Sequence, residues 1–335
     1  MSDNNKEKIL EVKNLEVKFF TDEGELPAID NLSLSIRRGE TLGIVGVSGC
    51  GKSMTALSIM RLLSPPGKIT NGEVLFKGQD LVKLSDKEIR KIRGNHIAMI
   101  FQEPMTSLNP VATIGNQIIE AIRTHNKEVS KKEAREKAIE MLKLVKIPLP
   151  EKRIDEYPHQ LSGGMRQRVM IAIALSCNPE LLICDEPTTA LDVTIQAQIL
   201  KLINQLKKKD NSSVIMITHD MGVISQMADN VIVMYAGKAV EYTTTKELFN
   251  NPLHPYTSGL INSIPKLNVE QEELEVIDGM VPLLSELPKG CLFNPRCKYA
   301  RDICREKSPE LIEIKDNHRV RCFKYSENWT EKGGE

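Results

Sequence analysis

Apolar and polar residues follow two kinds of spacing along this chain. Residues 8–20 alternate between the two classes, as an edge strand does, and residues 31–36 alternate in the same way. Shorter segments, each with an apolar run at its centre, predict buried strands at 40–46, 96–102, 179–187, 212–220 and 230–237. The last of these runs ends at Gly237, where we expect the chain to turn back.

Between these runs the spacing becomes helical. Ser130 and Glu133 have the separation of a capping box, and apolar residues then recur at helical spacing at Ala134, Ala138, Leu142 and Val145. We therefore expect the segment from about 103 to 160 to be a helical insertion, and residues 193–208 to form a further helix. Strands that alternate with helices predict an α/β fold with a largely parallel sheet covered on both faces. After about residue 250, proline and short polar stretches predict a separate appendage.

Composition narrows the class of protein. The 335 residues exceed what one compact domain usually needs, and Lys plus Arg equals Asp plus Glu at 45 each. That balance argues against a protein that binds nucleic acid through bulk positive charge. The polar N-terminus lacks a secretion signal, and no apolar run reaches the roughly 20 residues of a membrane-spanning helix. We expect a cytosolic chain whose seven cysteines are thiols or metal ligands.

A candidate phosphate loop lies at residues 46–53. The sequence GVSGCGKS fits G-x-x-x-x-G-K-[ST] between a predicted strand and a predicted helix, a context that disfavours a plain glycine-rich turn. Its glycines allow successive amide N–H groups to point at phosphate oxygens, beside the positive end of the helix. Lys52 adds a cation for the outer phosphates, Ser53 can ligate Mg²⁺, and Cys50 is best explained as a tolerated small residue.

An acidic pair follows another predicted strand. Asp185 and Glu186 come directly after an apolar run, and ligands of open α/β sheets bind at such strand ends. Asp185 can therefore hold Mg²⁺ opposite Ser53, and Glu186 can polarise an attacking water. Alone, an Asp-Glu pair would more often be a solvated turn. The phosphate loop earlier in the chain makes the functional interpretation much stronger.

A second anion site is predicted at the start of a helix. In QLSGGMRQRVMIAIAL, residues 160–175, the helix begins at Ser162, Gly163 and Gly164, and first-turn amides can receive a phosphate. A capped helix start with two flexible glycines is the alternative. Because loop 46–53 already provides a cradle for one nucleotide, we expect the second site to serve a nucleotide on another subunit.

Together these motifs resemble those of ATP-binding cassette (ABC) ATPases. LSGGMRQR is similar to the signature sequence of that family, and LLICDEPTTALD and MITHD follow it in the expected order. The resemblance covers residues 8 to about 245. It implies a P-loop NTPase cassette, which is a RecA-like parallel sheet core with an antiparallel β part and an inserted helical subdomain, followed here by a small cysteine-rich C-terminal extension. It also implies a head-to-tail pair of cassettes that clamps ATP between the phosphate loop of one and the Ser-Gly-Gly turn of the other.

The resemblance divides the chain and assigns roles to matching residues. The nucleotide-binding core would be residues 1–102 and 164–250, the helical signature subdomain 103–163, and the extension 251–335. Glu186, His219 and Gln102 would be catalytic, with His219 at the γ-phosphate and Gln102 at the attacking water. The Mg²⁺ ligands would be Ser53, Gln102 and Asp185.

Further positions would contact ATP, and Asp192 would cross the interface between cassettes. Phe19 resembles the aromatic residue that stacks on adenine, although Phe20 adjoins it. The complete set of implied ATP contacts is Phe19, Gly46, Ser48, Gly49, Cys50, Gly51, Lys52, Ser53, Met54, Gln102, Asp185, Ser162, Gly163, Gly164 and Asp192.

Two C-terminal stretches narrow the resemblance to one branch of the family. NPLHPYTSGL (251–260) and GCLFNPRCKYARDICREKSPEL (290–311) resemble the extension of bacterial dipeptide, oligopeptide and nickel importer ATPases. This implies a peripheral protein on the cytoplasmic face of the membrane that drives transmembrane permease subunits. The implied partners include a second ABC ATPase subunit, paralogous or identical, and an extracellular substrate-binding protein. We predict peptide uptake, with nickel uptake as the alternative within the family.

Rival classes predict different properties. A soluble ABC ATPase that remodels nucleic acid would bind DNA or RNA through a basic face in a salt-sensitive way. A P-loop kinase would have no use for the signature turn. The single cassette contains no long coiled coil, which argues against the DNA-repair and two-cassette translation classes. We expect no nucleic-acid partner.

Four cysteines gather near the C-terminus. Cys291, Cys297, Cys304 and Cys322 have the spacing C-x5-C-x6-C-x17-C. Zinc sites typically show closer pairs, whereas these wider gaps suit a [4Fe–4S] cluster. The cluster is the favoured prediction, and zinc and unligated thiols stay as alternatives. A bound metal group would act as a structural staple for an extension with little core.

Overall fold

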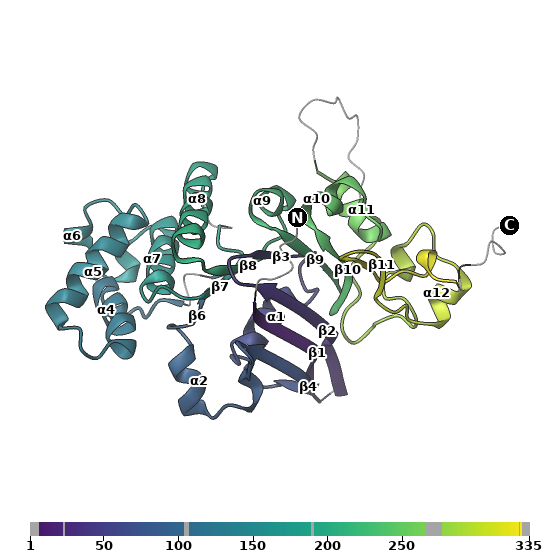
Figure 1. Ribbon diagram of the computed structural model, residues 1–335, viewed down its shortest axis with the longest axis horizontal. Coiled ribbons are helices and arrows are strands. Elements are labelled where there is room, and N and C mark those ends of the chain that lie inside the picture. Colours follow the sequence, from purple (N-terminus) through teal and green to yellow (C-terminus); the bar gives the residue numbers. More distant parts are fainter. Residues whose placement is uncertain are drawn as a thin grey trace. The chain divides into compact units, whose positions relative to one another are not determined.

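The computed structural model describes residues 7–22, 24–103, 107–188, 191–264, 277–327 and 329. Figure 1 shows the helices and strands of the chain, coloured along the sequence. The chain divides into two compact units. The first unit comprises Met1–Ile9, Ile36–Glu40 and Asp80–Met216. The second unit comprises Leu10–Ser35, Thr41–Gln79 and Ile217–Glu335.

The first unit combines short parallel strands with helices. Its strands run in the order β8-β7-β6, namely β8 (Ser213–Ile217), β7 (Leu181–Asp185) and β6 (Ile97–Ile100). Its helices are α2 (Asp86–Ile92), α4 (Ile114–His125), α5 (Lys131–Leu144), α6 (Pro150–Arg153), α7 (Gly163–Leu175) and α8 (Val193–Asp210), with 3-10 turns at Leu81–Lys83 and Pro158–Gln160. β6 and β7 are parallel from Ile97↔Leu181 to Ile100↔Cys184, and both are wholly buried, which confirms the strands predicted from their apolar runs.

Helices α4 to α7 form a block within this unit, drawn in teal in Figure 1. The predicted capping box starts α5, because Ser130 Oγ accepts from Glu133 N at 3.2 Å and Glu133 Oε2 accepts from Ser130 N at 2.9 Å. The residues at helical spacing are buried as expected, namely Ala134, Ala138, Leu142 and Val145. The helical insertion predicted from this spacing is therefore confirmed in type, while the proposed domain boundaries stay a prediction.

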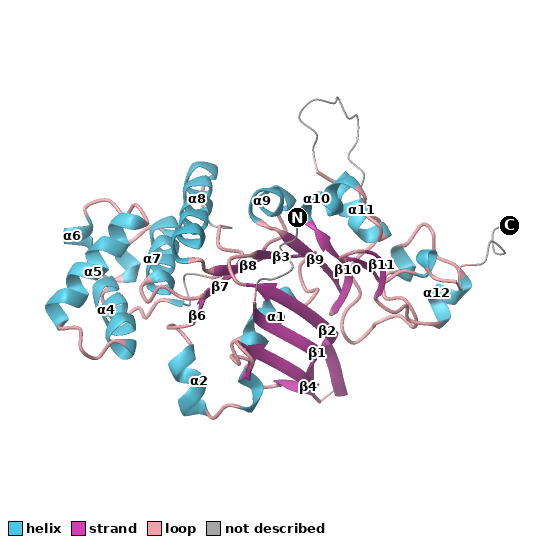
Figure 2. Ribbon diagram, in the orientation of Figure 1, coloured by secondary structure: helices cyan, strands magenta, loops and turns pink. Residues whose placement is uncertain are grey.

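The second unit contains two groups of strands, coloured magenta in Figure 2. One is an antiparallel sheet in the order β2-β1-β4-β5, and the other continues in the order β11-β12-β10-β9-β3. The first group is β1 (Lys8–Thr21), β2 (Gly24–Arg37), β4 (Gly67–Phe76) and β5 (Gln79–Asp80). The second group is β3 (Thr41–Val45), β9 (Asn230–Tyr235), β10 (Lys238–Thr244), β11 (Ile312–Lys315) and β12 (His318–Val320). The helices are α1 (Lys52–Ile59), α9 (Met221–Met227), α10 (Thr245–Asn250), α11 (Pro255–Asn262) and α12 (Asp302–Glu306), with 3-10 turns at Asn294–Arg296 and Phe323–Tyr325.

Two details of these strands bear on the predictions. β1 lies between β2 and β4 and is not an edge strand as its alternation suggested. Alternation reports one buried and one exposed face, and an interior strand of an antiparallel sheet can have both. At the end of β9, Ala236 (φ 44°) and Gly237 (φ 80°) supply the two positive φ values of a tight hairpin turn, so the predicted reversal at Gly237 is confirmed.

The region after residue 250 is built into the second unit rather than set apart as expected. β12 pairs with β10 at Glu241↔Val320. The carboxyl group of Glu241 is fully buried and accepts from the backbone N–H groups of Leu253 and His254, each at 2.8 Å. It also lies 2.8 Å from Nε2 of the buried His318. One side chain therefore joins β10, β12 and the segment that leads into α11.

We expect Glu241→Ala to lower the free energy of unfolding of this region by about 3–5 kcal/mol, because it removes one partner from a buried, hydrogen-bonded pair. Asp302→Ala is the matched control, since Asp302 (91% exposed) pairs with Arg305 at the surface of the same region and should cost less than about 1 kcal/mol. Trp329, the only tryptophan of the chain, allows denaturant unfolding to be followed by fluorescence. Equal losses for the two variants would contradict the prediction.

Candidate nucleotide-binding site

The predicted phosphate loop connects β3 to α1 in the second unit. Three of its glycines, Gly46, Gly49 and Gly51, have φ values of 154°, 79° and 103°. A Cβ atom on Gly46 would lie 2.3 Å from the carbonyl oxygen of Met234 and 2.6 Å from Cys50 Sγ. The loop therefore requires glycine both for backbone conformation and for close packing against β9.

Lys52 donates hydrogen bonds to backbone carbonyls of its own loop. Its Nζ donates to the carbonyl oxygens of Gly46 at 2.7 Å and Val47 at 3.1 Å, and the residue is only 5% exposed. Ser53 follows it on α1, half-buried. Burial raises the pKa of the Cys50 thiol, an effect partly offset by the Lys52 ammonium.

His219 and Phe19 also lie in the second unit. His219 is exposed just after β8, and the preceding Thr218 donates its N–H to the carbonyl of Ile44 on β3 at 3.3 Å. Phe19 is half-buried on β1, paired with Gly67 on β4, whereas the neighbouring Phe20 is 40% exposed. Which of these rings would stack on adenine stays a prediction.

The acidic pair and the glutamine meet in the first unit. Asp185 ends β7, and Gln102 follows β6, so both lie at the carboxyl edge of these parallel strands. Gln102 Nε2 donates to Glu186 Oε2 at 3.2 Å. Glu186 has a φ of 45°, which is unfavourable for a residue with a side chain and is typical of functional sites. Asp185 and Glu186 are both buried, at 3% and 8% exposure.

The signature turn starts α7 in the same unit. Ser162 caps the helix by accepting from Met165 N at 3.3 Å, which is the capped start that the sequence analysis gave as the alternative, while the predicted phosphate contact stays a prediction. Ser162 and Gly163 are exposed, and a Cβ atom on Gly163 would meet nothing within 4 Å. Gly164 is tighter, with Leu191 at 3.4 Å from its hypothetical Cβ.

Asp192 is the residue directly after Leu191. It is exposed and caps α8 by accepting from Ile195 N at 2.9 Å. Two residues of the preceding motif, Thr189 and Ala190, lie outside the described residues. Gln167 on α7 was not predicted as a site residue, yet its buried amide donates to the carbonyl of Pro187, just after Glu186. Only its place in the signature sequence, three residues after Gly164, could have drawn attention to it.

The predicted residues are thus divided between the units. Gln102, Asp185, Glu186, the 162–164 turn and Asp192 belong to the first, and they include a direct Gln102–Glu186 hydrogen bond. Residues 46–54, Phe19 and His219 belong to the second. In the second unit Tyr256 of α11 was also missed, although its hydroxyl accepts from Val47 N at 2.9 Å.

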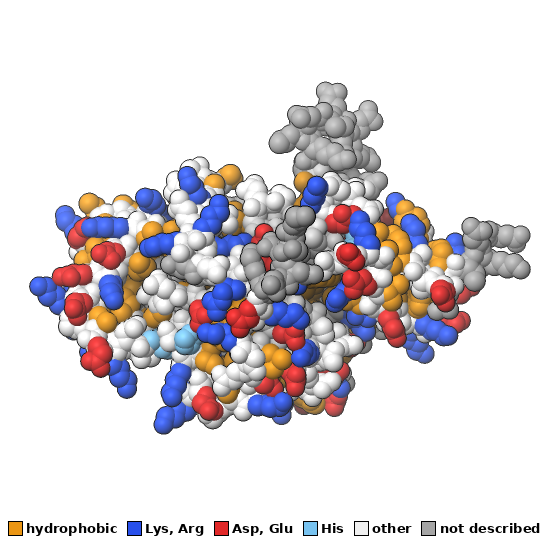
Figure 3. All heavy atoms as spheres, in the orientation of Figure 1, with side chains coloured by type: hydrophobic (Ala, Val, Ile, Leu, Met, Phe, Trp, Pro, Cys, Tyr) orange, Lys and Arg blue, Asp and Glu red, His pale blue; other side chains and the backbone are white. Residues whose placement is uncertain are grey.

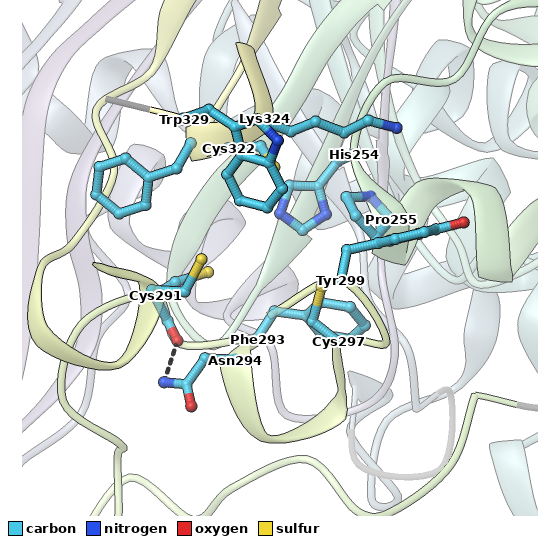
Figure 4. A pocket seen from close by; sticks show the side chains of 12 residues that line it. His254, Pro255, Cys291, Phe293, Asn294, Cys297, Tyr299, Cys322, Lys324 and Trp329 are labelled. Carbon is cyan, nitrogen blue, oxygen red and sulfur yellow. Dashed lines mark hydrogen bonds between the residues drawn. The ribbon is translucent and has the colours of Figure 1, made fainter. Parts of the chain in front are cut away.

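A second candidate site is the pocket lined by all four C-terminal cysteines, Cys291, Cys297, Cys304 and Cys322 (Figure 4). Its other walls include Phe293, Tyr299 and Trp329. All four thiols are free of disulfide bonds. Burial, reinforced by the neighbouring thiols, raises the pKa of Cys291 to about 11 and that of Cys322 to about 12. Among the described residues, no three His, Cys, Asp or Glu side chains are grouped as around one metal ion.

The pocket also has an apolar surround that the sequence did not predict. Tyr256 and Val320 are fully buried, and Phe293 and Phe323 are 4% and 7% exposed. The extension therefore has more core than its proline-rich sequence indicated. Its packing does not rest on the cysteines alone.

Buried His254, which caps α11, gives the extension a pH dependence. Its Nδ1 accepts from Tyr256 N at 3.1 Å, and burial, with a contribution from Arg321, lowers the pKa of His254 from 6.5 to about 3. Below about pH 6.5 the unfolded chain binds a proton that the folded chain does not, so stability falls by up to about 1.4 kcal/mol per pH unit towards pH 3. His254→Asn keeps a capping acceptor and should show a shallower pH dependence of unfolding. Equal slopes for the two proteins would contradict this.

Comparison with known proteins decides the family. Residues 29–189 match the family model for "ABC transporter", and residues 240–304 match that for "Oligopeptide/dipeptide transporter, C-terminal region". The chain is 54% identical to the oligopeptide transport ATP-binding protein AppD of Bacillus subtilis, with 97% of this chain and 99% of AppD covered. It is 50% identical to OppD of Escherichia coli, with 94% and 93% covered.

The chain belongs to the oligopeptide/dipeptide transport ATP-binding family of ABC ATPases.

Membership confirms the predicted ABC cassette fold and the predicted ATPase activity. The cassette fold is also that of the solved dimeric MJ0796 cassette bound to ADP and Pi, at a TM-score of 0.65 and 32% identity over 70% of this ABC ATPase and 98% of that chain. No helix in the described part of this ABC ATPase has the length and apolar character needed to cross a bilayer. On the face shown in Figure 3, cationic and anionic side chains are interspersed over the helical block and over the extension.

Proposed function

We propose that this ABC ATPase hydrolyses Mg²⁺-bound ATP to drive the uptake of dipeptides or oligopeptides through a membrane permease. The observation that carries the proposal is the near full-length similarity to relatives named for oligopeptide and dipeptide transport, which includes the C-terminal region. That region is what distinguishes this branch from other cassettes. Nickel uptake is the alternative within the same branch.

The chain's own residues support a hydrolytic mechanism. Loop 46–53 would hold the phosphates with its amides and Lys52, while Ser53, Asp185 and Gln102 would hold Mg²⁺. Bound Mg²⁺ would neutralise charge that develops on the phosphates. Glu186 would align the attacking water for in-line displacement, and the Gln102 hydrogen bond would fix its carboxylate. His219 would then assist at the γ-phosphate.

A complete site would need a second cassette. The exposed Ser162 and Gly163 lie at the start of a 13-residue helix, where first-turn amides can receive a phosphate. The open space around Gly163 gives the subunit no steric reason for glycine there, whereas close approach of a nucleotide held by another cassette would supply one. The similarity to a dimeric cassette also supports pairing with a second cassette.

Closing and reopening of the paired cassettes would move the helical block, and the block would then push or release the permease. Large apolar side chains are exposed just before this block and within it, with Val111 at 82% and Leu149 at 63% exposure. Covering these side chains with a partner surface would remove apolar area from water, which favours docking. Peripheral attachment at the cytoplasmic side of the membrane, with an extracellular binding protein across it, follows from this proposal.

Reconstitution tests the function. The tagged chain, purified with its membrane partners, would be placed in vesicles together with a binding protein. We expect labelled peptides to stimulate ATP hydrolysis and to accumulate inside, whereas Ni²⁺ should do neither. Stimulation by Ni²⁺ alone would assign the cargo to nickel. Stimulation by DNA or RNA, with salt-sensitive binding, would instead favour the nucleic-acid class.

The thiol pocket supports a second proposal, that Cys291, Cys297, Cys304 and Cys322 hold a [4Fe–4S] cluster. The ligands of a single zinc ion gather within about 2.3 Å of one point, whereas these four thiols are distributed around a pocket. All four thiols line one pocket and are free of disulfide bonds, which fits a group held by four thiolates. A bound cluster would supply a covalent cross-link between distant parts of the extension.

Anaerobic treatment with iron and sulfide should therefore give visible absorption, about four irons per chain, and quenching of Trp329, which lines the same pocket. Cys297→Ser should abolish all three signals, and Cys177→Ser, outside the pocket, should change none of them. Stoichiometric zinc with no iron would overturn the cluster in favour of a single ion.

A further inference from the structure

The hydroxyl of Tyr256 connects the C-terminal extension to the phosphate loop. It accepts a hydrogen bond from the backbone N–H of Val47 at 2.9 Å, across 209 residues of sequence. Tyr256 is fully buried on α11, and burial raises the pKa of its phenol above the ordinary value, so the hydroxyl stays protonated. Val47 is the second residue of the loop, directly after the tightly packed Gly46.

The same loop is held at a second point. The N–H of Gly237, in the hairpin between β9 and β10, donates to the carbonyl of Cys50 at 3.0 Å. Tyr256 therefore fixes the entrance of the loop, and Gly237 fixes the part that leads into α1. The amides between these two points are those that would face the phosphates.

Three aromatic rings determine where the Tyr256 hydroxyl lies. The Tyr256 ring packs against Tyr235 with centroids 4.9 Å apart and against Phe293 at 5.5 Å. Tyr235 and Phe293 also contact each other edge-to-face at 5.2 Å. Phe293 lines the thiol pocket (Figure 4). Through the Phe293–Tyr256 contact and the Tyr256 hydroxyl, this ring cluster therefore extends from the pocket to the loop. Offset and edge-to-face contacts restrict ring orientation as well as burying apolar area.

We infer that Tyr256 is a positioning residue for ATP binding: its hydroxyl presets the phosphate loop, and the Tyr235–Phe293 ring cluster holds Tyr256 in place. The extension is thereby part of the nucleotide site. This inference rests on the proposed role of loop 46–53 in binding ATP. It adds a residue outside the phosphate-loop pattern to that site.

Steady-state hydrolysis by the full-length chain tests the inference through KM and kcat. Tyr256→Phe keeps the ring and removes the hydrogen bond. The net free energy of one such bond corresponds to a change of about twofold to tenfold in the affinity for ATP. We expect KM for ATP to rise by this factor while kcat at saturating ATP stays within about twofold. A merely structural defect would lower the active fraction, and hence kcat, without raising KM.

Two further variants sharpen the test. Tyr325→Phe is the matched control, because the Tyr325 hydroxyl donates to the Leu253 carbonyl at 3.0 Å within the extension, and KM should not change. Phe293→Leu keeps apolar bulk but loses the ring, and it should raise KM in the same direction as Tyr256→Phe. If the parent chain is active and Tyr256→Phe leaves KM unchanged, the inference about Tyr256 is wrong, while the proposed ATPase activity is unaffected. An inactive parent chain would instead overturn the proposed ATPase.

Discussion

Replacing Glu186 by glutamine is expected to reduce ATP turnover by at least about a hundredfold while ATP affinity stays within about twofold of the parent, as expected when a general base is lost. The amide cannot take a proton from water, yet it preserves the size of the side chain and its contact with Gln102. Steady-state hydrolysis and equilibrium binding of labelled ATP would measure the two effects separately.

Glu140→Gln provides the matched control for this prediction. Glu140 is an exposed residue of α5 in the same unit, and the change removes the same charge from the chain. It should leave turnover unchanged. Hydrolysis by the Glu186 variant at the parental rate would show that another group aligns the water.

Gly163→Asp should produce a comparable loss of turnover by a different route. An added carboxylate at the signature turn would repel the phosphates and block their approach to the first-turn amides, and loss of such donors costs about a hundredfold to a thousandfold. The isolated subunit should be at least as stable as the parent, because nothing lies within 4 Å of the new Cβ and an acidic residue favours a helix N-terminus by about 0.3–1 kcal/mol.

Gly163→Asn separates charge from size, since it has nearly the same shape and no charge. The Asp variant should be the more severe of the two. In a Glu186→Gln background, ATP should drive the parent into dimers on size-exclusion chromatography and fail to do so with Gly163→Asp. If both Gly163 variants paired and hydrolysed ATP normally, residues 162–164 would not face a triphosphate.

Much of this molecule follows from short sequence patterns. The phosphate loop, the capping box at Ser130 and the cap at Ser162 are local, because each depends on residues within a few positions of one another. The buried strands were predictable from apolar runs for the same reason. These features account for the correct fold class and for most proposed site residues.

Contacts between distant residues were not predictable in this way. The Gln102–Glu186 bond joins residues 84 positions apart, and only the family resemblance suggested that both act on one water. The Tyr256–Val47 bond had no signal at all, since a tyrosine in a proline-rich stretch predicts nothing about a loop 209 positions earlier. The interior place of β1 was missed because alternation describes faces and not neighbours.

The extension shows the same limit in its packing. Its sequence indicated little apolar core. We therefore expected a metal group bound by the cysteines to hold the extension in a defined structure. The structure adds the Glu241–His318 pair and the aromatic cluster around Phe293, both assembled from segments far apart in sequence. Cysteine spacing could suggest which metal group to expect, but not how the surrounding chain is held.

The Tyr256–Val47 bond has a consequence for how such a chain can be shortened. A cassette trimmed after α10 would retain the phosphate loop, the signature turn and the acidic pair, and still lose the acceptor for a loop amide. Once the C-terminal extension supplies that contact, losing the extension weakens ATP binding. The extension is therefore hard to lose again during evolution. Minimal cassettes prepared from this branch would accordingly underestimate how well the intact protein retains ATP.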